Sequence, residues 1–267
     1  MVEMRLISLH DQERIAAWLS RNADLNIYQI GDLDRFFWLS TVWYGLEQAG
    51  ELFQLALIYL GHSTPIWLMF DDQQHRYSAY LRDALRPLLP AKIYCHFSPG
   101  IAEGLADRYQ IEDHGLHQKM ILQDFSKLDQ VVIDQAVVQL HPADLPAINQ
   151  LYAEAYPDNA FDPRMLETGC CYGIWRDDQL ISIAGIHVYS PNYRVAALGN
   201  ITTHPAYRGQ GLAKQVTAKL CQSLRHEINH IGLNVHRANQ AAINTYQALG
   251  FGWVADYSEV LLRQKDC

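Results

Sequence analysis

The sequence of 267 residues is poor in charge and has no strongly basic stretch. Only 19% of its residues are charged, the formal net charge is −8, and lysine and arginine do not gather in a block. A basic surface is what binds nucleic acid or an anionic membrane, so we expect neither partner. Hydrophobic residues make up 49% of the chain, which is enough to bury real cores.

Cysteine is also scarce, and its spacing is not that of a metal site or a disulfide framework. The five cysteines are odd in number and include no C-x-x-C pair, and no histidine lies at metal-ligand spacing from them. We therefore expect free thiols, a reducing cytoplasm and no metal. The adjacent pair Cys170–Cys171 could be redox-active or could touch a metal, but two buried thiols are the favoured interpretation.

Long apolar runs are missing as well. The longest, Leu52–Leu60, has the length of a strand and is far too short to span a membrane. The first residues lack the basic region and apolar core of a signal peptide. These absences lead us to expect a cytoplasmic protein.

Two pairs of segments resemble each other and predict an internal duplication. Met4–Ala23 and Ala136–Tyr156 both have a short apolar strand, a Leu-His turn and a helix, and Leu105–Leu122 resembles Thr245–Leu262. The polar stretch Gln123–Gln135 is the expected connection. We predict an α+β protein of two similar units, each with a mixed, mostly antiparallel sheet flanked by helices.

The second half has a glycine turn between a strand and a long helix. Strands are expected at Cys171–Asp177, Gln179–Ser190, Tyr193–Thr203 and Ile231–Arg237, with helices from Leu212 onward and at Asn239–Leu249. The turn reads Arg208-Gly-Gln-Gly and leads directly into the helix. Such a junction points free backbone N–H groups and the positive helix end at one place, which predicts a site for phosphate.

Three nucleotide-binding motifs compete for this turn. A P-loop needs G-x-x-x-x-G-K-[ST], which "RGQGLAK" does not match, and a dinucleotide fold needs a third glycine that is absent. The third candidate is coenzyme A, and a resemblance to a known family favours it. The segments "HPAYRGQGLA" and "NVHRANQAAINTYQALGFGW" resemble the GNAT superfamily of N-acetyltransferases. The resemblance rests on Arg208, Gly211 and Ala213 in the first motif, and on Asn239, Tyr246, Gly250 and Phe251 in the second.

The resemblance implies two domains and acetyl-CoA as cosubstrate. A GNAT domain would span 136–267, and 1–125 would be a degenerate GNAT-like domain without the cofactor motif. The pantetheine arm would bond to the main chain of the strand end, and the pyrophosphate to the turn. The implied cofactor-binding residues are Ile201, Thr202, Thr203, Arg208, Gly209, Gln210, Gly211, Leu212, Ala213, Asn239 and Tyr246. For Arg208 an ordinary surface ion pair, and for Asn239 a plain helix N-cap, remain alternatives.

The resemblance also implies a proton donor but leaves the base open. Tyr246 would protonate the departing thiolate, unless it is only a core residue. The strand before the turn has no carboxylate, so His187 on the neighbouring strand is the candidate base, against a purely structural histidine. Glu154, Glu167 or a water chain are further possibilities, and main-chain N–H near Ile201 would hold the oxyanion.

These residues together predict an N-acetyltransferase that moves an acetyl group to an amine by direct attack in a ternary complex. The acceptor, a small molecule or a peptide, cannot be read from the chain, and the protein is expected to be a monomer or a homodimer. A non-catalytic acyl-CoA sensor and a phosphate-binding nucleotide regulator are the alternatives. The aromatic stretch Asp34–Leu46 could form a wall of the acceptor pocket, although ordinary packing is favoured.

Overall fold

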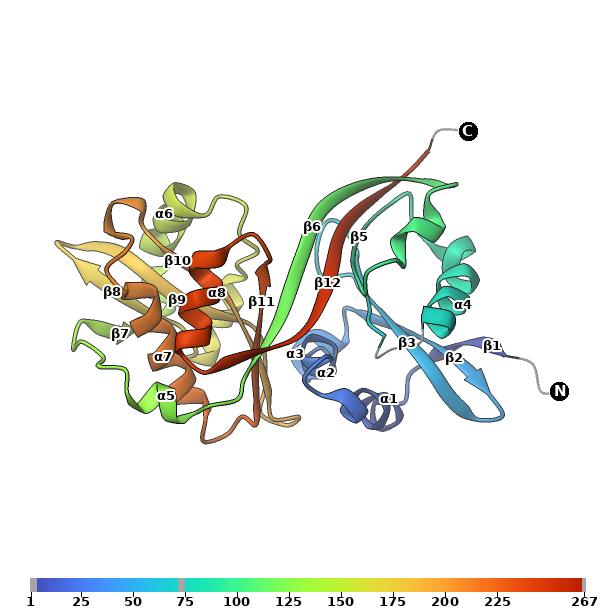
Figure 1. Cartoon of the computed structure of the whole chain (residues 1–267), viewed down its shortest axis with the longest axis horizontal. Helices are drawn as coiled ribbons and strands as arrows, with labels where there is room; N and C mark the ends of the chain where they lie inside the picture. Colours follow the sequence, from blue (N-terminus) through green and yellow to red (C-terminus); the bar gives the residue numbers. More distant parts are fainter. Residues whose placement is uncertain (1–3, 72–74, 266–267) are drawn as a thin grey trace. The chain divides into compact units, whose positions relative to one another are not determined.

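The computed structural model describes residues 4–71 and 75–265, which divide into two compact units. Unit 1 comprises Met1–Lys119 and Val254–Cys267, and unit 2 comprises Met120–Trp253. The chain passes from unit 1 to unit 2 within strand β6 (Tyr109–Leu122) and returns within strand β12 (Phe251–Gln264) (Figure 1). The last strand, which we expected to lie in the second domain, therefore lies mostly in unit 1.

Unit 1 is a mixed sheet with the strand order β1-β2-β3-β4-β5-β12-β6. Strands β4 and β5 pair in parallel, whereas β1 with β2, β2 with β3, β3 with β4, and β5 with β12 pair antiparallel. The elements are β1 (Arg5–Leu9), α1 (Gln12–Leu19), η1 (Ser20–Asn22), α2 (Ile27–Gly31), α3 (Arg35–Trp38), β2 (Thr41–Gln48), β3 (Glu51–Tyr59), β4 (Ile66–Met69), α4 (His75–Leu85), η2 (Arg86–Leu88), β5 (Lys92–Phe97) and η3 (Ala102–Leu105).

The core of unit 1 is built where α4 packs on β1, β2 and β3. Leu81 and Leu85 of α4 meet Trp67, Ile93 and Phe97 from the strands, all of them fully buried. The spacing of four residues puts both leucines on one helix face, as an amphipathic helix requires. The aromatic stretch 34–46 contributes α3 and the start of β2.

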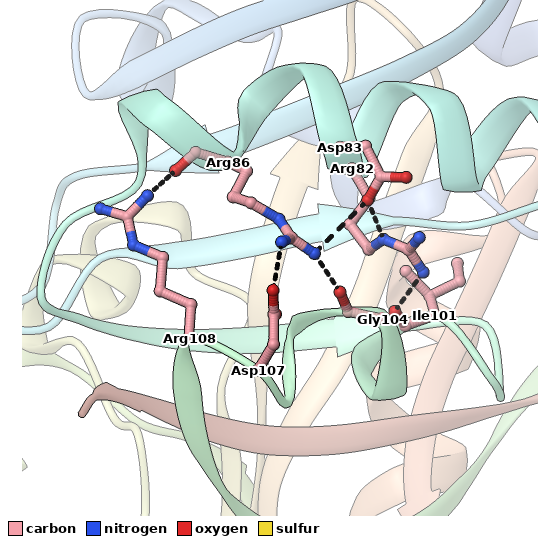
Figure 2. Close-up of polar contacts among 7 residues, drawn as sticks. All are labelled: Arg82, Asp83, Arg86, Ile101, Gly104, Asp107 and Arg108. Atoms are coloured by element: carbon pink, nitrogen blue, oxygen red, sulfur yellow. Dashed lines mark hydrogen bonds and ion pairs between the residues drawn. The ribbon is translucent and has the colours of Figure 1, made fainter.

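Three arginines fasten the η3 segment to α4 and η2 in unit 1 (Figure 2). Arg82 donates to the Ile101 carbonyl at 3.2 Å, and Arg86 donates to the Gly104 carbonyl. Arg108, which follows η3, donates to the Arg86 carbonyl of η2 at 2.8 Å. These guanidinium groups satisfy carbonyls that a short 3₁₀ turn leaves without partners.

Unit 2 repeats the plan of unit 1. Its strand order β7-β8-β9-β10-β11 has three antiparallel contacts followed by one parallel contact, as β1 to β5 have. The topological duplication predicted from the sequence is therefore confirmed, and so is the fold class. The elements are α5 (Ser126–Asp129), β7 (Val137–Gln139), η4 (Pro142–Asp144), α6 (Leu145–Ala155), η5 (Pro163–Thr168), β8 (Tyr172–Arg176), β9 (Gln179–Ser190), β10 (Val195–Thr203), η6 (Pro205–Tyr207), α7 (Leu212–Leu224), β11 (His230–His236) and α8 (Gln240–Ala248).

The helices of unit 2 pack on the central strands. Helix α6 packs on β9 and β10, and α7 packs on β8, β9 and β10. The stretch 123–135, expected as a plain connection, contains α5, and its Leu128 is fully buried. No helix in the described part of the chain is both long and apolar enough to cross a lipid bilayer.

Candidate functional site

The site of unit 2 begins where two parallel strands stop pairing. Strands β10 and β11 are in register from Val195 and His230 up to the pair Leu198 and Leu233. Both strands continue beyond that pair, β10 to Thr203 and β11 to His236. Along these extensions the main chains of β10 and β11 do not pair with each other in the described structure. An extended ligand could therefore form hydrogen bonds with them.

A β-bulge in β10 lies at this point. Gly199 pairs with Gly185 on β9 and Thr202 pairs with Ile183, so β10 holds two residues opposite one residue of β9. Asn200, the first of the two, has φ 54°, in the left-handed region that non-glycine residues rarely adopt. A bulge of this kind bends the strand and re-aims its groups, as is frequent next to active sites.

Two asparagine side chains at this point have polar atoms without partners. Asn200 is 4% exposed, and neither its amide nitrogen nor its amide oxygen makes a hydrogen bond within the described structure. Asn234, the residue after Leu233 on β11, has a buried amide oxygen that likewise lacks a donor there. Buried polar groups are normally satisfied, so these amide atoms are available to hydrogen-bond a ligand at this position. No sequence motif predicts either asparagine as a site residue.

The glycine turn follows β10 and is open to solvent. Gly209 and Gly211 have φ 76° and 73°, and a Cβ placed on either would meet no atom within 4 Å. Glycine is therefore required at both positions by the left-handed backbone conformation. The open space above them is the cradle that a phosphate group would need.

The helix after the turn offers free donors. The first backbone hydrogen bond of α7 runs from the Gln215 N–H to the Gly211 carbonyl, and no side chain caps the helix. The preceding N–H groups of Leu212, Ala213 and Lys214 therefore lack an acceptor within the helix. The first turn of α7 has no acidic residue, so the positive end of the helix dipole is not neutralised.

Arg208 is bound to carbonyls. Its Nε donates to the Thr203 carbonyl at 3.2 Å, and its Nη2 donates to the Ala155 carbonyl at 3.4 Å. The alternative of a surface ion pair is not what the structure shows. These bonds join the turn to β10 and to the end of α6, while the role of Arg208 toward phosphate stays a prediction.

A histidine–glutamate pair, not foreseen from the sequence, supports the same turn. His204 Nε2 lies 3.0 Å from Glu154 Oε2, and His204 Nδ1 accepts a hydrogen bond from the Ala206 N–H at 3.2 Å. The backbone bond fixes the neutral tautomer in which Nε2–H donates to the carboxylate. Both ring nitrogens are thereby engaged, and His204 links the start of the turn to helix α6.

Tyr246 lies on α8 and is 8% exposed. The centre of its ring lies 6.0 Å from the ring centre of Phe251, in an edge-to-face arrangement. Its hydroxyl has no hydrogen-bond partner in the described part of the chain. Burial, followed by the nearby Tyr156 and Cys221, raises the pKa of Tyr246 well above its usual value. The phenol therefore keeps its proton throughout the neutral range.

His187 occupies a second bulge, on β9. Ile186 pairs with Leu198 and Val188 pairs with Ala197, so His187 is the extra residue between them. Its half-buried ring lies against Gly199, where an added Cβ would overlap the imidazole. His187 is therefore beside the bulge of β10, and its role as a base stays a prediction.

Five further expected residues lie in four places: Asn239 at α8, Thr202 and Thr203 on β10, Gln210 in the turn and Glu167 in η5. Asn239 is the N-cap of α8 and accepts a hydrogen bond from the Ala242 N–H at 3.1 Å, as its alternative interpretation held. Thr202 and Thr203 both contact Ser182, through the Thr202 carbonyl and the Thr203 hydroxyl. Gln210 is exposed in the turn, and Glu167 is exposed in η5.

The corresponding place in unit 1 is closed. Strands β4 and β5 stay paired to their ends at Met69 and Phe97, and the Ser98 N–H donates to the Met69 carbonyl at 3.3 Å. The next residues bring a carboxylate, since Asp71 accepts a hydrogen bond from the Ser78 hydroxyl at 2.9 Å. In the described part of unit 1, the strands at this position are therefore paired to their ends and followed by an acidic side chain.

Comparison with known proteins identifies unit 2. Residues 135–251 match the sequence model of the acetyltransferase (GNAT) family. These residues form a GNAT acetyltransferase domain. Membership of this family supports acyl transfer in general terms, and no curated protein is similar enough to the chain to match it.

Solved GNAT structures share the fold of the chain. A putative acetyltransferase from Novosphingobium aromaticivorans is 20% identical, with a TM-score of 0.56 over 79% of this chain and 89% of its own. A tandem GNAT protein of the clavulanic acid biosynthesis pathway is 18% identical, with a TM-score of 0.55 over 98% of both chains. A GCN5-related N-acetyltransferase from Sphaerobacter thermophilus is 12% identical, with a TM-score of 0.62 over 99% of this chain and 97% of its own.

Proposed function

We propose that the GNAT domain is an N-acetyltransferase that moves the acetyl group of acetyl-CoA to an amine by direct attack in a ternary complex. The observation that carries the proposal is the separation of β10 from β11 directly before an uncapped helix with an open glycine turn. An extended arm ending in a pyrophosphate fits these two features together. Neither feature alone would favour coenzyme A over another phosphate ligand.

The residues divide into two groups for binding the cosubstrate. The main chain of Ile201, Thr202 and Thr203 would hold the pantetheine arm, with the amides of Asn200 and Asn234 reaching its polar groups. The turn and the start of the helix would hold the pyrophosphate through residues 208–213. Acetyl-CoA supplies an activated thioester, and the chain itself supplies position and hydrogen bonds.

Proton handling would involve Tyr246 and His187. Because Tyr246 keeps its proton at neutral pH, it can donate to the departing thiolate, although its raised pKa makes it a weaker acid than an ordinary phenol. His187 would take the proton of the attacking amine, directly or through water. The N–H of Ile201 at the bulge would stabilise the oxyanion.

Unit 1 would be a GNAT-like unit that has lost the cofactor site, because the equivalent strands are paired and followed by Asp71. A cytoplasmic location is supported by four buried free cysteines, Cys95, Cys170, Cys171 and Cys221. The amine acceptor would be a small molecule or a peptide.

The proposal is tested by mixing the protein with acetyl-CoA and a panel of amines and measuring the release of free thiol. We expect at least one amine to accelerate release, and Tyr246→Phe to lower turnover more than cofactor affinity. Thiol release that no amine accelerates, together with tight acetyl-CoA binding, would favour the alternative of a non-catalytic sensor. The absence of a carboxylate from β10 is the observation behind that alternative.

A further inference from the structure

One face of the unit 1 sheet has a cluster of ionisable side chains that the proposed transferase does not use. His96 of β5 lies opposite Glu259 of β12 in the antiparallel register. Tyr94 and Tyr257, each two residues away, share that face because side chains alternate along a strand. His117, from the neighbouring strand β6, reaches the same carboxylate.

Glu259 is the anionic centre of this cluster. Its two oxygens accept hydrogen bonds from the Tyr94 hydroxyl at 2.5 Å and the Tyr257 hydroxyl at 2.6 Å. His96 Nε2 and His117 Nε2 each lie 3.7 Å from Oε1. Burial acts to raise the pKa of Glu259, but these histidines and hydroxyls lower it to about 2, so the carboxylate is ionised.

Lys119 on β6 is the cationic group of the cluster. It is 3% exposed, and its ammonium lies 3.8 Å from the ring centre of Phe70, with Tyr28 at 5.2 Å and Tyr257 at 5.1 Å. It makes no hydrogen bond and no ion pair in the described part of the chain. Burial lowers the pKa of Lys119 to about 7, and Glu259 acts in the opposite direction.

The two charges therefore influence each other without closing into an ion pair. A third group, His96 Nδ1, is buried and has no hydrogen-bond partner within the described residues. Burial lowers the pKa of His96 to about 4, so its ring is neutral and has one nitrogen free to accept. A buried nitrogen without a hydrogen-bond partner is costly and rare without a ligand, and in the described part of the chain Lys119 has only aromatic rings as partners.

We propose that unit 1 binds a small zwitterion of the α-amino-acid type at this cluster. Its carboxylate would bind the Lys119 ammonium, and its ammonium would bind Glu259. A simple anion fits less well, because it would face Glu259, and a simple cation would face Lys119. The side chains of Glu259, His96 and His117 are 15–17% exposed, so this part of the cluster is in contact with solvent.

The experiment is thermal unfolding with and without free amino acids, using phenylalanine and leucine as probes. Phenylpropionate and phenethylamine serve as analogues that each lack one of the two charges. We expect a saturable rise in Tm with at least one amino acid and none with its single-charge analogues. The assay does not involve acyl transfer, and the cluster variants described next separate binding in unit 1 from binding of an amine at the proposed transferase site.

Two variants keep the test decisive. Lys119→Met and Glu259→Gln should each abolish the rise in Tm, whereas Lys92→Met, at an exposed lysine of the same unit, should retain it. If one cluster variant fails to fold, the other decides. No rise in the wild type, an equal rise with phenylpropionate, or an undiminished rise in the folded cluster variants would overturn the proposal.

Discussion

The buried ammonium of Lys119 predicts how the stability of unit 1 depends on pH. Its pKa is about 7 in the folded protein, against an ordinary value of 10.5. Between these two values the unfolded chain binds a proton that the folded chain does not, so stability rises with pH in that window. Below about pH 7 both states are protonated and the full penalty of burying the charge is present.

The free-energy penalty of burying the Lys119 ammonium follows from the size of its pKa shift. At about 1.4 kcal/mol per pH unit, a fall from 10.5 to about 7 corresponds to about 5 kcal/mol in all. Raising the pH from about 6.5 to about 9.5 should recover about 3 kcal/mol of this penalty. Lys119→Met, which has no charge to bury, should show none of this dependence.

The assay is urea unfolding of the wild type and of Lys119→Met at both pH values, followed by tryptophan fluorescence. Four of the six tryptophans precede Lys119, and Trp43 and Trp67 are almost fully buried in unit 1, so fluorescence reports mainly on this unit. The control is Lys92→Met, whose difference from the wild type should not change with pH. A difference between wild type and Lys119→Met that is the same at both pH values would refute the reasoning.

Three further predictions concern unit 2. Gly209→Ala should lower the free energy of unfolding by about 1 kcal/mol through its left-handed backbone alone, since the added methyl meets no atom; urea titration measures this, and a loss of several kcal/mol would contradict it. Asn200→Gly should raise the free energy of unfolding by about 1 kcal/mol, because glycine accepts a positive φ and the two unpaired amide atoms are removed. The same change should weaken acetyl-CoA binding, and an unchanged affinity for acetyl-CoA would show that Asn200 does not contact it. Tyr246→Phe should lower kcat with little change in KM, and an unaltered kcat would make Tyr246 a core residue only.

Much of unit 2 could be predicted from the sequence, because its signals are local. The turn at Arg208–Gly211 stands between a β-branched strand and an amphipathic helix, and α7 begins at Leu212 as expected. The strand Gln179–Ser190 was predicted with the bounds it has. The two bulges were not predicted, because a register shift at His187 or Asn200 depends on the pairing of β9 with β10 and leaves no residue pattern of its own.

Two features of unit 1 depend on contacts between residues distant in sequence. The alternation of polar and apolar residues in the last segment predicts a strand. It does not predict which of the two units that strand joins. Lys119 and Glu259 are 140 positions apart, and each alone resembles a solvent-facing residue of a half-exposed strand. Polar residues at alternate positions of β5, β6 and β12 were the one available signal, and it became informative only once these strands were known to be neighbours.

The central claim is that the turn before α7 binds the pyrophosphate of acetyl-CoA. Calorimetric titration of acetyl-CoA tests it, with wild type, Gly211→Trp and a matched control, Gly100→Trp, at an exposed glycine of unit 1 that also has positive φ and no atom near its Cβ. We predict binding by the wild type and by Gly100→Trp, and none by Gly211→Trp that is folded by circular dichroism. Equal affinity for acetyl-CoA in all three proteins would contradict the claim.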